Sequence, residues 1–259
     1  MVNLDERLAE IRKMIDRKYY FSINRGRQFG KTTTLNALKD YLQKDFIVVS
    51  LDFQFLTQAA FENEQTFSTA FARRFVFALR RVPEAEGEAL DRIKRCAEDK
   101  SCMMAELFEE LSEFCASAKK PVILLIDEVD SASNNQVFLD FLALLRGYYL
   151  QREEFPTFQS VILAGVYDIR NLKQKIRPDS EHNHNSPWNI AAAFDVNMEL
   201  ETEGIAGMLA EYEADYHTGM DVERMAELLY EETSGYPFLV SRFCQLLDEQ
   251  VSGGGEFRD

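Results

Sequence analysis

Residues 19–35, YYFSINRGRQFGKTTTL, decide the fold of this chain. An apolar run rich in β-forming side chains ends at a basic turn that contains glycine, and a helical pattern begins at Lys31. A strand, a Gly-Lys-Thr turn and a helix in that order are the context of a phosphate-binding loop. The backbone N–H groups of such a loop and the N-terminus of its helix both favour an anion. The stretch therefore predicts a loop that binds nucleotide phosphates.

Each residue type in this loop has an expected task. Gly30 allows the backbone to approach a phosphate, Lys31 reaches the β- and γ-oxygens, and the Thr32 hydroxyl is a ligand for Mg²⁺. The run departs from the pattern G-x-x-x-x-G-K-[ST] at its first position, where Arg25 stands in place of glycine. The alternative interpretation is a basic turn that opens an ordinary helix. The expected nucleotide contacts are Arg25, Gly26, Arg27, Gln28, Phe29, Gly30, Lys31, Thr32 and Thr33.

A second motif lies at residues 121–130, PVILLIDEVD. Four apolar residues followed by an acid form the pattern known as Walker B, and an acid at the end of a buried strand can hold Mg²⁺. Glu128 comes next and can orient or deprotonate an attacking water. The alternative is a strand that ends in an acidic turn. The two motifs together predict Lys31, Asp127 and Glu128 as catalytic residues, with Thr32 and Asp127 as metal ligands.

The apolar patterns predict an α/β fold. Strands are expected at 19–24, 46–52, 121–127, 160–166 and 193–200, with helical patterns at 3–17, 65–118, 134–150 and through the C-terminal third. Strands that alternate with helices form parallel βαβ units. We expect a P-loop core over 1–200, a helical lid over 201–250 and a flexible tail over 251–259.

Composition limits the partners. Forty-six per cent of the 259 residues are hydrophobic and the net charge is −15, which favours a globular protein and makes a nucleic-acid surface unlikely. The arginine pairs at 73–74 and 80–81 are interpreted as a solvated face. The four cysteines lack metal-binding spacing, and no apolar run is long enough to span a membrane, so we expect free thiols, no membrane and a cytoplasmic location.

The roles of two further residues are left open. Asp168 follows the fourth expected strand, where a polar side chain can sense the γ-phosphate or cap the next helix. Arg146 is a weak candidate for the arginine that would complete the site.

The segments NRGRQFGKTTTL, ILLIDEVD, VILAGVYDIRNLK, SPWNIA and SGYPFLVSRFC together resemble the bacterial AAA-ATPase-like family, related to archaeal and signal-transducing P-loop ATPases. The resemblance covers about residues 4–250. It implies a five-stranded parallel sheet with the order 5-1-4-3-2 and ATP as the nucleotide. It also places Gly235 and Pro237 of the lid near the adenine base.

These features are compatible with three functions. The first is a Mg²⁺-dependent ATPase whose hydrolysis drives a conformational switch. The second is a nucleotide-binding interaction module that does not hydrolyse ATP. A nuclease or nucleic-acid motor is disfavoured by the acidic charge and the lack of a basic stripe. An unidentified protein partner and an oligomer remain open.

Overall fold

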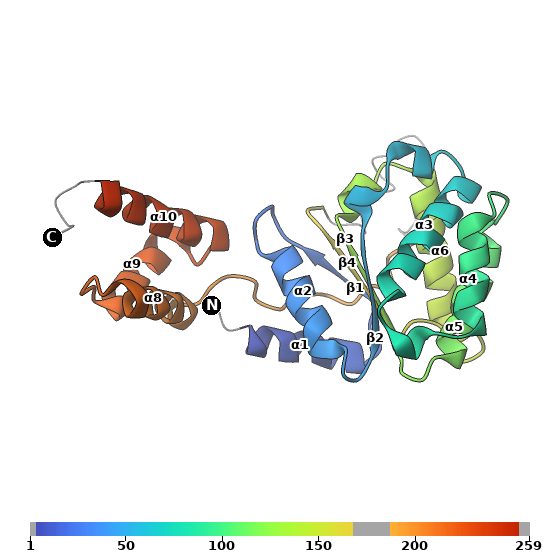
Figure 1. Cartoon of the computed structure of the whole chain (residues 1–259), viewed down its shortest axis with the longest axis horizontal. Helices are drawn as coiled ribbons and strands as arrows, with labels where there is room; N and C mark the ends of the chain where they lie inside the picture. The colour runs from blue at the N-terminus through green and yellow to red at the C-terminus, as the bar shows by residue number, and fades with distance from the viewer. Residues whose placement is uncertain (1–3, 168–186, 254–259) are drawn as a thin grey trace. The chain divides into compact units, whose positions relative to one another are not determined.

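A computed structural model describes residues 4–167 and 187–253 (Figure 1). These residues fall into two compact units. The larger unit contains Ile11–Arg25 and the described part of Lys31–Asp195. The smaller unit contains the described residues of 1–10 and 196–259, together with the loop segment Gly26–Gly30. The predicted division into core, lid and tail stays a prediction.

The larger unit is built on a parallel sheet. Its strands have the order β1-β4-β3-β2, and they are β1 (Phe21–Asn24), β2 (Ile47–Asp52), β3 (Val122–Asp127) and β4 (Ser160–Gly165). Every residue of the two central strands is buried, which explains their continuous apolar sequences. The β2–β3 register pairs Asp52 with Asp127, so both strands end at the same edge of the sheet. The predicted parallel α/β fold is confirmed.

The predicted fifth strand is wrong. The sheet has four strands among the described residues. An isolated bridge pairs Phe21 with Ala192, just before the predicted strand, and residues 193–200 form no strand. Val196, Met198 and Leu200 are buried in alternation, which is the pattern that predicted a strand. Side-chain hydrogen bonds satisfy backbone groups of the residues between them. The Arg7 guanidinium donates to the carbonyls of Asn197 and Glu199.

Helices cover both faces of the sheet (Figure 1). One face carries α2 (Lys31–Leu42), and the other carries α3 (Glu64–Leu79), α4 (Glu88–Glu98), α5 (Met104–Ser117) and α6 (Gln136–Leu150). Helix α3 begins with a capping box between Asn63 and Thr66. Its Phe67, Phe71 and Phe75 repeat every fourth residue and are fully buried. The aromatic stripe is therefore core packing against the sheet.

The remaining helices lie at the two ends of the chain. They are α1 (Asp5–Asp16), α8 (Thr202–Tyr216), α9 (Val222–Thr233) and α10 (Pro237–Gly253). Ile205, Leu229 and Val240 form the centre of a separate apolar cluster, so the smaller unit has a core of its own. No helix in the described ranges is long and apolar enough to cross a membrane.

The cysteines are free thiols. Burial raises the pKa of the Cys102 and Cys115 thiols, so both are protonated near neutral pH. Within residues 4–167 and 187–253, no group of three or more metal-binding side chains could hold an ion.

Candidate nucleotide site

The loop between β1 and α2 has two residues in the left-handed region. Gln28 has a φ of 62° and Gly30 a φ of 76°. Such residues bend successive N–H groups into the concave arrangement that binds anions. Space is open beside Gly30, where an added Cβ would meet nothing within 4 Å. Gln28 is not a glycine, so its left-handed backbone conformation is strained, and strained residues are common at ligand-binding sites.

The departure at Arg25 does not require an unusual backbone. Arg25 is absent from the positive-φ residues, so the left-handed turns of the loop fall at positions 28 and 30 instead. Its N–H donates to the carbonyl of Gly165 at 3.3 Å, which anchors the start of the loop to the end of β4. Its guanidinium carbon lies 5.8 Å from the centre of the Phe194 ring. Glycine is therefore not needed at this position.

Lys31 is the first residue of α2 and is buried, with 7% of its side chain exposed. Its ammonium donates to the carbonyl oxygen of Arg25 at 2.8 Å. The side chain thus turns back along the loop that precedes it. An ammonium has three donors, so Lys31 can bind phosphate oxygens from this position while it still supports the loop.

Thr32 and Asp127 come together across 95 residues of sequence. The Thr32 hydroxyl donates to Asp127 Oδ2 at 2.6 Å. The other carboxylate oxygen, Oδ1, accepts the N–H of Glu128 at 2.9 Å. Asp127 is buried at the end of β3, where parallel strands present their carboxyl ends to ligands. A hydroxyl and a carboxylate at this edge are hard oxygen ligands of the kind that Mg²⁺ takes.

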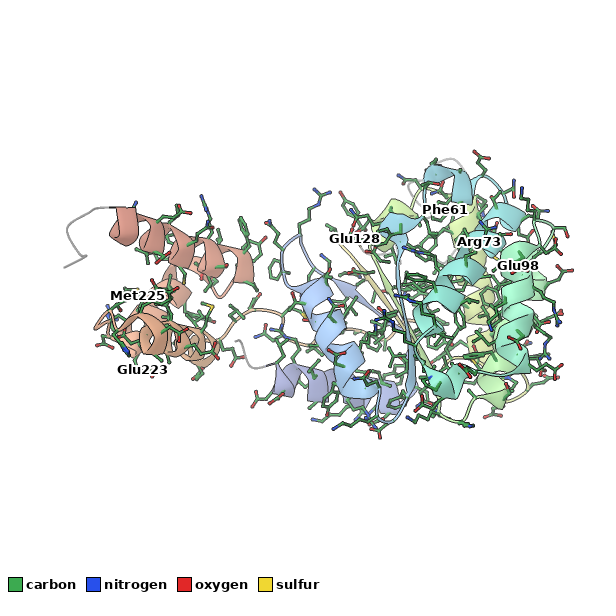
Figure 2. All side chains as sticks on the ribbon, in the orientation of Figure 1. Phe61, Arg73, Glu98, Glu128, Glu223 and Met225 are labelled. Carbon is green, nitrogen blue, oxygen red and sulfur yellow. The ribbon has the colours of Figure 1, made fainter. Side chains whose placement is uncertain are left out.

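Glu128 has a strained backbone. Its φ of 54° and ψ of 39° lie in the left-handed region, which is uncommon for glutamate. Its carbonyl accepts hydrogen bonds from the backbone N–H and the hydroxyl of Ser131, which fixes the turn η4 (Val129–Ser131). Figure 2 labels Glu128 at the edge of the sheet, on the turn that follows β3. Glu128 is half-buried.

Asp130 is a site-forming residue that the sequence motifs did not identify. Its carboxylate accepts the N–H groups of Val166 and Tyr167. Both backbone donors follow β4, so one side chain connects the turn after β3 to the end of the neighbouring strand. An added Cβ at Gly165 would lie 3.0 Å from both carboxylate oxygens, so this close approach needs glycine. The signal was present in DEVD, whose second aspartate lies three residues after the end of the strand.

In the smaller unit, the turn between α9 and α10 contacts the phosphate loop. The Tyr236 hydroxyl donates to the Arg27 carbonyl at 2.6 Å, and its ring stacks on Phe29 with centroids 4.5 Å apart. Sequence analysis predicted contacts from Gly235 and Pro237 but missed the tyrosine between them. Gly235 donates to the Thr233 hydroxyl and accepts from the Leu200 N–H, so its polar groups are already paired.

Gly235→Ala is expected to destabilise the smaller unit by about 3 kcal/mol or more. Gly235 has a φ of +70°, and an added Cβ would lie 2.1 Å from the carbonyl oxygen of Leu200. Hydrogen exchange of α9 and α10 amides measures the change. Gly219→Ala is the matched control because its φ is +76° but nothing lies within 4 Å of the added Cβ. It should cost about 1 kcal/mol. Equal effects of the two substitutions would contradict the predicted clash.

The structure does not test the roles predicted from sequence for Asp168 and Arg146. Asp168 lies outside the described residues. Arg146 is half-buried in α6, and its Nε is buried with no hydrogen-bond partner among the described residues. No contact within the described ranges links it to the nucleotide site.

The fold is similar to that of proteins with known structures. The ADP form of the ORC2 protein from Aeropyrum pernix matches with a TM-score of 0.53 at 12% identity, over 95% of this chain and 64% of that one. The ORC1 protein of Aeropyrum pernix, solved with DNA, has a TM-score of 0.46 at 12% identity, over 83% of this chain and 50% of that one. Cdc6p from Pyrobaculum aerophilum has a TM-score of 0.45 at 12% identity, over 81% and 48%. The chain thus spans about half to two thirds of the length of these proteins.

Fold and motifs together define a member of the P-loop ATPase class. The family model of the AAA-like domain matches residues 8–252, nearly the whole chain. The chain therefore belongs to the AAA-like domain family, as its motifs predicted. Among curated proteins, none matches this sequence.

Proposed function

We propose that this chain is a Mg²⁺-dependent ATPase whose nucleotide cycle works as a conformational switch. The observation that carries the proposal is the 2.6 Å hydrogen bond between Thr32 and Asp127, which joins the phosphate-loop helix to the end of β3. These are the two oxygen donors that a P-loop ATPase uses at its metal. Bound Mg²⁺ would neutralise charge on the β- and γ-phosphates.

The roles of the chain's own residues follow from the local geometry. Gln28 and Gly30 shape the loop for phosphate, and the Lys31 ammonium supplies positive charge from a buried position. Thr32 and Asp127 would hold the metal. Glu128 would orient the attacking water and accept its proton. The rest of the loop from Arg25 to Thr33 would contact the phosphates or the ribose.

The adenine end of the site is assigned to the turn between α9 and α10. Gly235 and Pro237 remain the proposed contacts, and Gly235 would contribute only its apolar surface because its N–H and C=O are paired within the smaller unit. The Tyr236 ring and Phe29 already stack, so an aromatic surface is present beside the loop. We propose ATP rather than GTP as the nucleotide because of the family to which the chain belongs.

Calorimetry with ATP is the direct test. Saturable binding in Mg²⁺ should weaken about tenfold or more in EDTA, and phosphate release should depend on the metal. A wild-type protein that gives no heat with Mg²⁺-ATP would contradict the proposal. GTP titrated under the same conditions checks the choice of nucleotide.

The second candidate is a nucleotide-binding interaction module that does not hydrolyse ATP. Its distinguishing result is binding of Mg²⁺-ATP with no phosphate release above that of buffer. The presence of Glu128 in a strained turn beside Asp127 favours hydrolysis.

A further inference from the structure

A surface on α3 carries arginines that have no acidic partner. Arg74, Arg80 and Arg81 lie on this helix or directly after it, and among the described residues no carboxylate lies within ion-pair distance of any of them. The neighbouring Arg73, labelled in Figure 2, donates from Nε to the carbonyl of Ala97 in α4, which ties it to another helix. Arg80 donates from Nη1 to the Phe77 carbonyl of α3. Arg73, Arg80 and Arg81 are exposed and Arg74 is half-buried, so the two pairs lie on a largely solvated face, as the sequence predicted.

Two exposed aromatic rings lie against these arginines. The guanidinium carbon of Arg74 is 4.5 Å from the ring centroid of Phe55 and 6.0 Å from that of Phe77. The guanidinium carbon of Arg80 is 3.5 Å from the Phe77 centroid. Phe55 is 66% exposed and Phe77 is 54% exposed. We call these four residues the Arg–Phe patch.

The patch combines two arginines that form no ion pair among the described residues with two exposed aromatic rings, in a chain where carboxylates are abundant. The sequence has 44 acidic and 29 basic residues. Six other cations of the described residues pair with acids: Arg12 with Asp16 and Asp45, Arg92 with Glu88, Glu110 and Glu113, Lys94 with Asp91, Lys120 with Glu84, Arg224 with Glu227, and Arg242 with Glu249. The Arg–Phe patch is thus a local positive surface on an acidic protein.

Stacking prepares these arginines to bind a carboxylate. A ring that packs on a guanidinium leaves edge N–H groups that can bind the two oxygens of a carboxylate. In Arg80 one of these groups is already used, because Nη1 donates to the Phe77 carbonyl at 2.7 Å. The stack also limits the rotation of the side chain, so less entropy is lost on binding. Phe55 and Phe77 add exposed apolar surface beside the charges.

We propose that the Arg–Phe patch is a docking surface for an acidic segment of a protein partner that also carries apolar side chains. Charge complementarity identifies the acidic component, and the two rings identify the apolar component. A nucleic acid is less favoured because a net charge of −15 repels an extended phosphate chain around so small a patch. The proposal goes beyond the nucleotide site and does not depend on ATP binding.

The patch is connected to the turn that carries Glu128. Phe55 ends the short turn η1 (Phe53–Phe55), which directly follows β2. The Ser131 hydroxyl of η4 donates to the carbonyl of Phe53 at 3.2 Å. A partner seated on Phe55 would therefore contact the element that braces the proposed water-activating turn.

Fluorescence anisotropy with a defined probe tests the surface. The probe is a fluorescein-labelled peptide of Glu-Glu-Phe repeats, compared with Ser-Ser-Phe repeats and with an oligothymidylate carrying the same dye. Wild-type protein should bind the acidic peptide best, and binding should weaken as salt rises. Arg74→Glu combined with Arg80→Glu should weaken binding by about tenfold or more.

The matched control changes the same amount of charge elsewhere. The control variant combines Arg17→Glu, directly after α1, with Lys39→Glu on α2, and both residues are exposed. Its affinity for the acidic peptide should stay within about twofold of wild type. Phe55→Ser combined with Phe77→Ser should weaken binding through loss of the rings. Circular dichroism and ATP calorimetry on every variant separate a folding defect or a nucleotide effect from a docking effect. The proposal is overturned by absent peptide binding, by equal loss in the control, or by preferred oligothymidylate binding that the Arg74 and Arg80 substitutions abolish.

Discussion

Glu128→Gln is expected to reduce phosphate release by about 100-fold or more while ATP affinity stays within about threefold. Glutamine has the same shape but cannot accept a proton, and general-base catalysis contributes about 10²- to 10⁴-fold. The substitution keeps the backbone hydrogen bonds of the turn, since these use the carbonyl and N–H of residue 128. Single-turnover phosphate release and ATP calorimetry on the same samples make the measurement.

The control for this prediction is Glu98→Gln on α4, an exposed residue labelled in Figure 2. It should leave both the rate and the affinity unchanged. If Glu128→Gln releases phosphate as fast as the wild type, another group activates the water. If neither protein releases phosphate but both bind ATP, the interaction-module function is favoured.

Lys31→Ala is expected to weaken ATP binding by about 100-fold, to the point where calorimetry detects little heat. The substitution removes charge-assisted hydrogen bonds to phosphate, each worth about 1.5–3 kcal/mol. It also removes the bond from the Lys31 ammonium to the Arg25 carbonyl, so part of the loss comes from a loosened loop.

Lys39→Ala is the matched control for this prediction. It lies on the same helix, α2, but is exposed, so ATP affinity should change little. Lys31→Arg helps to separate charge from shape, because arginine keeps the charge but cannot fold back as a compact ammonium. Wild-type affinity in Lys31→Ala would mean that the nucleotide binds elsewhere.

The strands and the two motifs could be predicted because local sequence determines them. A six-residue apolar run such as 121–126 has few alternatives to a buried strand, and its acid must then lie at the sheet edge. The meeting of Thr32 with Asp127 follows from parallel strand order. The region 65–118 corresponds to α3, α4 and α5. Phenylalanines at every fourth position (Phe67, Phe71 and Phe75) indicated a helix there.

The failures share a physical cause, which is that hydrogen-bond partners are set by tertiary structure. Buried and exposed residues alternate along 193–200 as in a strand, but the Arg7 guanidinium donates hydrogen bonds to two backbone carbonyls of this segment. The roles of Asp130 and Tyr236 depend on backbone groups 36 and 209 residues away, at Val166 and Arg27. Spacing patterns hold no information about such pairings.

The strand order has a consequence for synthesis of the chain. In the order β1-β4-β3-β2, the two strands made first are never neighbours, because both central strands come later. A ribosome that has reached residue 121 has produced β1 and β2 but neither partner strand. Their edges, with backbone N–H and C=O groups, stay unpaired until β3 and then β4 emerge, and nascent chains aggregate at such edges. The helices of 64–117 are made in this interval, and their local contacts give the growing chain a structure to collapse on before the sheet can close.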